Sequence, residues 1–127
     1  MTIEEFRALQ KPKQPKYHNV KCEYDGIKFD SIAEKDRYVE LKLLLQAGEI
    51  RGFKRQPSFL FENGTRYRPD FIVCGKDGEI WTEDVKGVET QAFKIKKKLW
   101  EHEYPWLELR TVRSKTKGGN TTWLDIT

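Results

Sequence analysis

The stretch "YRPDFIVCGKDGEIWTEDVKG", residues 67–87, decides the fold of this chain. Two runs rich in β-branched and aromatic residues flank Asp77-Gly78, a dipeptide typical of a tight hairpin turn. The pattern therefore predicts two antiparallel strands, at about 66–74 and 79–86.

The second of these strands carries charges at alternate positions. Side chains alternate across a strand, so one face receives Thr82, Asp84 and Lys86 and the other receives Trp81, Glu83 and Val85. Charges on a solvated face would need no explanation. The question is whether this face is solvated or forms the floor of a site.

The segments on either side extend the sheet. A strand at about 53–61 precedes Asn63-Gly64, a second tight turn, and completes an antiparallel meander. A helix at about 90–104 ends before Pro105, and "LELRTV", 107–112, should return as a parallel partner through a right-handed crossover. "TTWLDI", 121–126, adds an edge strand.

The N-terminal half supplies a hairpin and a helix. "VKCEYDGIKF", 20–29, alternates around Asp25-Gly26, and a helix over 31–47 begins at Ser31 and stops at Gly48. The predicted fold class is therefore α/β in the broad sense, and more closely an α+β arrangement in which helices pack on a mixed sheet. We expect one domain over 20–127, preceded by a basic arm over 1–19 that contains Pro12 and Pro15.

Composition narrows the function. The chain lacks an apolar run of membrane-spanning length, and its start lacks the pattern of a signal peptide, so we expect no membrane association. Cys22 and Cys74 form no disulfide framework, which favours a cytosolic protein with reduced thiols. The net charge of +4 comes from lysine and arginine clusters interleaved with aromatics; nucleic-acid binding and plain solubility explain this equally well.

Three carboxylates are expected to converge. The meander brings Asp70 close to Asp84, and Glu34 continues the helical stripe of Tyr38 and Leu41 toward the sheet. Carboxylates that face a core are costly and would repel one another. A divalent cation would relieve this repulsion, and hard oxygen ligands favour Mg²⁺ or Mn²⁺.

Each of these residues also has a purely structural interpretation. Ser31 and Glu34 fit a capping box, which is the favoured interpretation of Glu34 alone. Asp70 could simply end a strand, and Asp84 with Lys86 could be an ion pair of little energetic weight. The functional interpretation depends on all of them occurring together.

With these residues in view, the chain resembles the PD-(D/E)XK nuclease superfamily. "RPDF", 68–71, and "EDVKG", 83–87, resemble its signature, with Pro69-Asp70 and Asp84-Val85-Lys86 in the motif positions and Glu34 as the upstream helical acid. The longer runs "KYHNVKCEYDGIKFDSIAEKDRYVELKLL" and "FKIKKKLWEHEYP" are similar to small phage-encoded endonucleases that resemble Holliday-junction resolvases. The likeness covers about residues 16–112; Glu83 leaves a one-residue ambiguity, although only Asp84 shares a face with Lys86.

The resemblance implies a restriction-endonuclease-like core of order αβββαβ and a metal-dependent DNA endonuclease that hydrolyses phosphodiester bonds, with branched DNA as a candidate substrate. Glu34, Asp70, Asp84 and Lys86 would be catalytic. Asp70, Asp84, the Val85 carbonyl and Glu34 would hold Mg²⁺, for which Mn²⁺ substitutes. Symmetric cutting of a junction implies a homodimer, and the relatives imply a phage- or prophage-encoded protein in the bacterial cytoplasm.

Further residues are candidates for DNA contact. They are polar or basic and lie on the arm, beside Asp70 and along the second helix: Lys16, Arg68, Thr90, Lys94, Lys96 and Lys97. The inner arc of that helix is expected to hold Ala92, Phe93, Ile95, Leu99 and Trp100. Lys96 falls inside this arc, where it either snorkels outward, the favoured alternative, or reaches the site.

Gln56 could hydrogen-bond to a metal ligand without touching the metal, or it could contact a phosphate. The favoured alternative is that it is an ordinary polar residue of a strand. For the whole chain, the rival function is a non-catalytic nucleic-acid-binding module of phage DNA metabolism.

Overall fold

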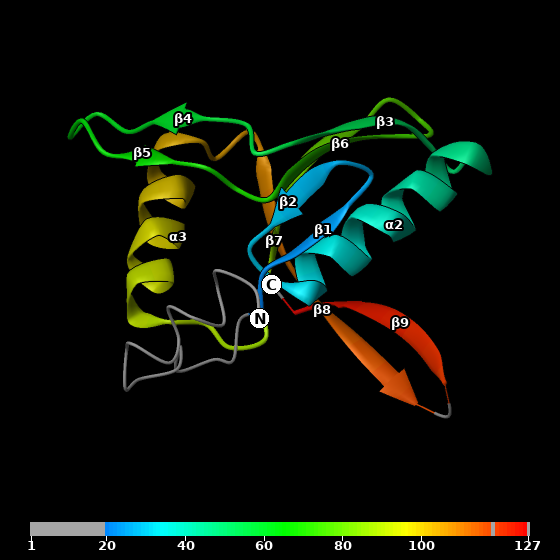
Figure 1. Ribbon diagram of the computed structural model, residues 1–127. Coiled ribbons are helices and arrows are strands. Elements are labelled where there is room, and N and C mark those ends of the chain that lie inside the picture. The colour runs from blue at the N-terminus through cyan, green and yellow to red at the C-terminus, as the bar shows by residue number, and fades with distance from the viewer. Residues whose placement is uncertain (1–19, 118, 127) are drawn as a thin grey trace, which may run out of the picture.

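The computed structural model describes residues 20–117 and 119–126; the arm over 1–19, with Lys16, lies outside this part (Figure 1). Within the described residues, the elements follow in this order: β1 (Cys22–Tyr24), β2 (Ile27–Phe29), α2 (Ile32–Gln46), β3 (Ile50–Arg55), β4 (Phe59–Leu60), β5 (Arg66–Tyr67), β6 (Phe71–Gly75), β7 (Ile80–Val85), α3 (Gln91–Glu103), β8 (Glu108–Lys117) and β9 (Asn120–Asp125).

The central sheet has five strands in the order β3-β6-β7-β8-β9. β7 and β8 are parallel and are joined through α3, whereas the other neighbours are antiparallel. The predicted α+β class is therefore confirmed, together with the meander, the parallel return and the edge strand. The particular nuclease core that the resemblance implies stays a prediction.

Two predicted strands are each divided in two. The strand expected at 53–61 breaks after Arg55 into β3 and β4, and the one expected at 66–74 breaks after Tyr67 into β5 and β6. Pro57 and Pro69 lie at these breaks and have no N–H for a sheet ladder. Gln56, at the first break, also has a left-handed backbone with a φ of 48°. β4 and β5 consequently pair only with each other.

The central sheet is covered on both faces. One hydrophobic cluster joins Leu41 of α2 to Phe71, Val73, Trp81, Val85 and Val112 of the sheet. The second joins Phe61 and Tyr67, from the hairpin region, to Phe93 and Trp100 of α3 and to Leu109. Figure 1 shows α3 beside the β4–β5 hairpin and α2 beside β3 and β6. β7 is therefore buried along residues 81–85.

Helix α3 turns a narrower face inward than expected. Phe93 and Trp100 are buried, but Ala92 and Ile95 are exposed, so the predicted inner arc is wrong for these two residues. The buried stripe follows positions 93, 96 and 100, which places half-buried Lys96 between the two aromatic residues.

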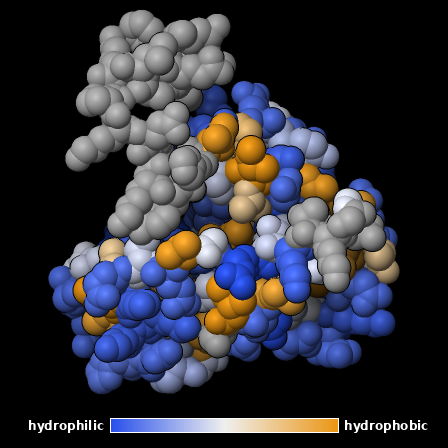
Figure 2. Space-filling model, turned by 90° about the horizontal axis from the view of Figure 1, so that it is seen from below, coloured by the Kyte–Doolittle hydropathy of each residue, from blue (hydrophilic) through white to orange (hydrophobic). Residues whose placement is uncertain are grey.

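The surface seen from below is mostly hydrophilic, with hydrophobic residues reaching it in several separate places (Figure 2). Within residues 20–117 and 119–126, no helix has both the length and the apolar character needed to cross a membrane.

Candidate functional site

Asp70 lies opposite Asp84 because of the register between β6 and β7. Phe71 pairs with Glu83, so Asp70, the residue before β6, lies opposite Asp84, the next residue along β7. The Val85 N–H donates to Oδ2 of Asp70 over 2.7 Å, and the Gln56 N–H donates to the Asp70 carbonyl oxygen over 2.9 Å. Both bonds fix Asp70 where the strands end.

Asp84 is almost completely buried on the face that α3 covers. Its Oδ2 accepts a hydrogen bond from the Tyr67 hydroxyl, and its Oδ1 lies 3.6 Å from Nζ of Lys86. The Lys86 side chain remains 31% exposed, so part of it can be reached from solvent. Asp84 thus lies between a buried hydroxyl and a reachable cation.

Glu34 brings a third carboxyl group to the same place. The Ser31 hydroxyl accepts from the Glu34 N–H over 3.1 Å, which confirms Ser31 as the N-cap of α2. The Glu34 side chain lies near those of Asp70, Asp84 and Lys86 and interacts with all three. The cap and the carboxylate cluster therefore coexist: the backbone of Glu34 serves one and its side chain the other.

The cluster has unusual acid–base properties. Burial, followed by the charge of Asp84, holds the pKa of Asp70 well above its usual range. Burial, and then the charge of Asp30, raises the pKa of Glu34. The carboxyl groups of Asp70 and Asp84 therefore lie close together, where their negative charges oppose each other. A cation held between the acids would relieve this repulsion.

The donor atoms match magnesium in chemical class, because they are carboxylate oxygens on a face that also holds a strand end. Their positions are not yet those of a metal centre: within the described part of the chain, no group of three His, Cys, Asp or Glu side chains is arranged to hold a metal ion. Binding would require the carboxyl groups to turn toward a common centre.

Glu83 belongs to the other face of the sheet. Its two carboxylate oxygens accept from Nε and Nη2 of Arg37 over 2.8 and 2.7 Å, and Trp81 Nε1 donates to Oε2 over 2.8 Å. Asp84, and not Glu83, therefore shares the face with Asp70 and Lys86. This placement agrees with the strand alternation expected from the sequence.

Two lysines approach the cluster from the α3 side. Lys86 Nζ lies 5.0 Å from the centre of the Phe93 ring, and Lys96 Nζ lies 5.5 Å from the centre of the Tyr67 ring. Since Tyr67 is the hydrogen-bond partner of Asp84, Lys96 reaches toward the site. This contact favours the alternative in which Lys96 reaches toward the site over the one in which it snorkels outward.

The other candidate contacts are more peripheral. Thr90 caps α3, and its hydroxyl accepts from the Phe93 N–H over 3.1 Å. Lys97 lies 3.8 Å from Glu89, while Arg68 and Lys94 are exposed. Gln56 has an exposed side chain and touches Asp70 through its backbone, so its support of the site is not a side-chain function.

Sequence reasoning missed Tyr67 and Arg37. Arg37 follows Glu34 by three residues, on the same side of the helix, and this spacing could have indicated an inward direction. Tyr67 gave no such signal, because its approach to Asp84 depends on the break before β6.

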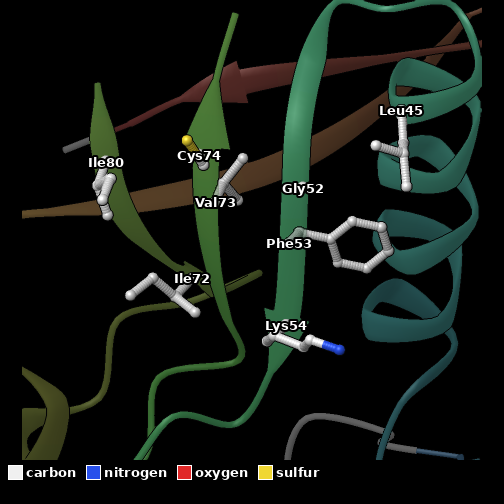
Figure 3. Close-up of a pocket in the computed structure, with 8 residues that line it drawn as sticks. All are labelled: Leu45, Gly52, Phe53, Lys54, Ile72, Val73, Cys74 and Ile80. Carbon is white, nitrogen blue, oxygen red and sulfur yellow. The ribbon is translucent and has the colours of Figure 1, made fainter. Parts of the chain in front are cut away.

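The hollow in Figure 3 lies elsewhere. It measures about 490 Å³ and is lined by residues of α2, β3, β6 and β7, among them Leu45, Phe53 and Ile72. None of the clustered carboxyl groups lines it. The site is instead the end of the sheet beside α3.

The chain is an α+β protein whose mixed sheet carries three carboxyl groups and a lysine at one end. The chain belongs to the family described as "Protein of unknown function (DUF1064)", which matches residues 14–118. No curated protein and no solved structure matches it significantly.

Proposed function

We propose that this protein is a metal-dependent DNA endonuclease of the PD-(D/E)XK type, acting on branched DNA such as four-way junctions. The observation that carries the proposal is the convergence of Glu34, Asp70 and Asp84 near the end of β7, with Lys86 3.6 Å from Asp84. Three acids that meet at a strand end destabilise the folded protein unless the cluster serves a ligand.

Asp70 and Asp84 would hold the ion with the Val85 carbonyl, and Glu34 would take a second ion or its water. When bound, Mg²⁺ or Mn²⁺ would supply charge stabilisation at the phosphate and a more acidic water. Without the ion, the carboxylates would repel a phosphodiester.

The remaining roles fall to nearby side chains. Lys86 would orient the attacking water or neutralise negative charge that develops on the phosphoryl oxygens. Tyr67 would hold Asp84 in one orientation. Backbone phosphates would be bound on the α3 side by basic side chains and helix amide groups, namely Lys94, Lys96, Lys97, Arg68 and the amides at Thr90. Lys16 of the arm would bind them as well.

The cellular setting follows from the resemblance to phage-encoded endonucleases, and we propose action in the cytoplasm of a bacterial host. Cys22 and Cys74 are free thiols, which suits a reducing compartment. On a four-way junction, symmetric cutting calls for two sites and therefore a homodimer.

The decisive experiment is a cleavage panel of linear, nicked, flap and four-way DNA with Mg²⁺, Mn²⁺ or EDTA. Wild type should cut with either metal and not with EDTA, and Asp84→Asn should abolish cutting. Asp25→Asn is the matched control, because Asp25 is exposed in the β1–β2 turn and its left-handed backbone suits asparagine.

Two results would contradict the proposal in different ways. DNA binding without cleavage of any substrate would favour the non-catalytic nucleic-acid-binding module. Wild-type cleavage by Asp84→Asn would refute the site while leaving the activity.

A further inference from the structure

A buried ion pair joins the two elements that carry Glu34 and Asp84. Arg37 lies one helical turn after Glu34 on α2, and Glu83 is the residue before Asp84 on β7. The paired hydrogen bonds between Arg37 and Glu83 therefore connect the first turns of the helix to the end of the central strand.

The geometry of this pair is fixed from several sides. Glu83 is fully buried and Arg37 is 9% exposed. Trp81 donates to the same carboxylate, and the guanidinium group lies 5.1 Å from the centre of the Trp123 ring of β9. A planar guanidinium with two parallel bonds to one carboxylate has a single favourable arrangement.

Stability alone does not account for a charged pair at this position. It adjoins the apolar cluster of Leu41, Phe71 and Val85, and apolar side chains of similar volume are often as stabilising as a buried ion pair. Apolar contacts are also non-directional, so Leu41 and its neighbours would tolerate a helix that slides along the sheet. The ion pair supplies the directional contact that they lack.

We propose that the Arg37–Glu83 pair is a positioning device that holds Glu34 against Asp70 and Asp84. Arg37 and Glu83 touch no substrate; they act through the placement of α2. The catalytic meaning of this placement rests on the proposed nuclease function, but the placement itself does not.

The test variant is Arg37→Met/Glu83→Gln, which removes both charges together and leaves an amide oxygen to accept from Trp81. The matched control is Asp25→Asn/Lys42→Met, which removes the exposed pair between the same helix and the β1–β2 hairpin, where the charged atoms lie 2.6 Å apart. Far-ultraviolet circular dichroism and thermal unfolding establish that both variants fold.

The first measurement is proximity, without metal or DNA. Cysteines replace Glu34 and Asp70 in a Cys22→Ser/Cys74→Ser background, and a short bifunctional maleimide joins them, with the yield read by mass spectrometry. The yield should fall about fivefold in the Arg37→Met/Glu83→Gln background, which corresponds to about 1 kcal/mol, and should stay unchanged in the control. An unchanged yield in the folded test variant would overturn the proposal.

The second measurement uses Mn²⁺ alone, with electron paramagnetic resonance on the protein with Glu34 and Asp70 intact. The half-saturating concentration should rise about tenfold in the test variant, as for other residues that orient metal ligands, and Arg37→Lys should be intermediate because it restores charge without the fork. Wild-type Mn²⁺ affinity in the test variant would count against the proposal.

The two proposals fail separately. If the cross-link yield falls in the test variant but wild type neither binds Mn²⁺ nor cuts DNA, the positioning role of Arg37 and Glu83 is supported and the nuclease function is refuted. If wild type cuts DNA with metal but the cross-link yield is unchanged in the test variant, the nuclease function is supported and the positioning role is refuted.

Discussion

Glu83 and Asp84 are neighbours in the chain, but their carboxyl groups lie on opposite faces of the central sheet. Glu83 bonds Arg37 on the α2 face, whereas Asp84 accepts from Tyr67 on the α3 face. Strand alternation thus gives one dipeptide two tasks: one acid anchors a helix and the other belongs to the candidate site.

Tyr67→Phe should weaken both the fold and the activity. The hydroxyl is buried and donates to Asp84, so its loss should lower the free energy of unfolding by about 1–3 kcal/mol. Cleavage should fall about tenfold as Asp84 loses its fixed orientation. Urea unfolding and single-turnover cleavage measure the two effects.

Tyr24→Phe, at an exposed tyrosine of β1, is the control and should change neither quantity. Reduced stability with wild-type cleavage would assign Tyr67 to packing only.

Lys96→Ala should impair cleavage more than Lys98→Ala. Both changes remove one charge from α3, but Lys96 reaches the ring of Tyr67 and Lys98 is exposed. We expect single-turnover cleavage at saturating protein to fall about tenfold for Lys96→Ala and to change little for Lys98→Ala. Equal losses in the two variants would mean that Lys96 contributes only general attraction for the DNA backbone.

Asp70→Asn should stabilise the metal-free protein at neutral pH. The pKa of Asp70 is raised well above its ordinary value of 3.8, so the folded state keeps a proton that the unfolded state has lost. The contribution of Asp70 to the free energy of unfolding therefore falls as pH rises from about 4 to the raised pKa of the folded state, and stays constant at higher pH. Asp70→Asn has no such pH-dependent loss of stability, and the asparagine amide oxygen can still accept from the Val85 N–H.

Urea unfolding of both proteins between about pH 3 and pH 8 measures the difference, which should grow with pH. Asp77→Asn, in the exposed β6–β7 turn, is the control and should follow wild type. A constant difference between Asp70→Asn and wild type across this range would disprove the raised pKa.

Gln56→Gly should leave cleavage intact. The exposed side chain is dispensable, and the backbone bond to Asp70 survives in glycine. Relief of the left-handed backbone offsets the added chain entropy, so stability should stay within about 1 kcal/mol. Gln56→Pro is the contrasting variant: it removes the N–H and excludes a positive φ, and both stability and cleavage should fall. A loss in Gln56→Gly equal to that in Gln56→Pro would show that the side chain matters.

Local chemistry predicted most elements of the fold. Gly26, Gly64 and Gly78 all adopt positive φ in turns that the sequence marks, and Ser31 and Thr90 cap the helices expected after them. The broken strands escaped prediction because apolar alternation continues across Pro57 and Pro69. A missing N–H at each proline was the available signal, and it outweighs the pattern.

The site was predictable to the extent that it follows from strand register and helix periodicity. These bring Asp70, Asp84 and Glu34 together. The partners of the acids were not predictable in this way, since Tyr67 and Arg37 approach from elements whose placement is tertiary. Lys96 shows the same limit: its position on the helix was clear, but the ring that it reaches lies 29 residues earlier in the chain.

The parallel pairing of β7 with β8 affects how the molecule is made. Every acid and lysine of the cluster has been synthesised by residue 86, yet the strand that flanks β7 on its other side begins only at residue 108. A nascent chain therefore contains all the reactive groups before it has the partner that secures their strand. The candidate site can therefore fold only after α3 and β8 have left the ribosome, so it is completed late in biosynthesis.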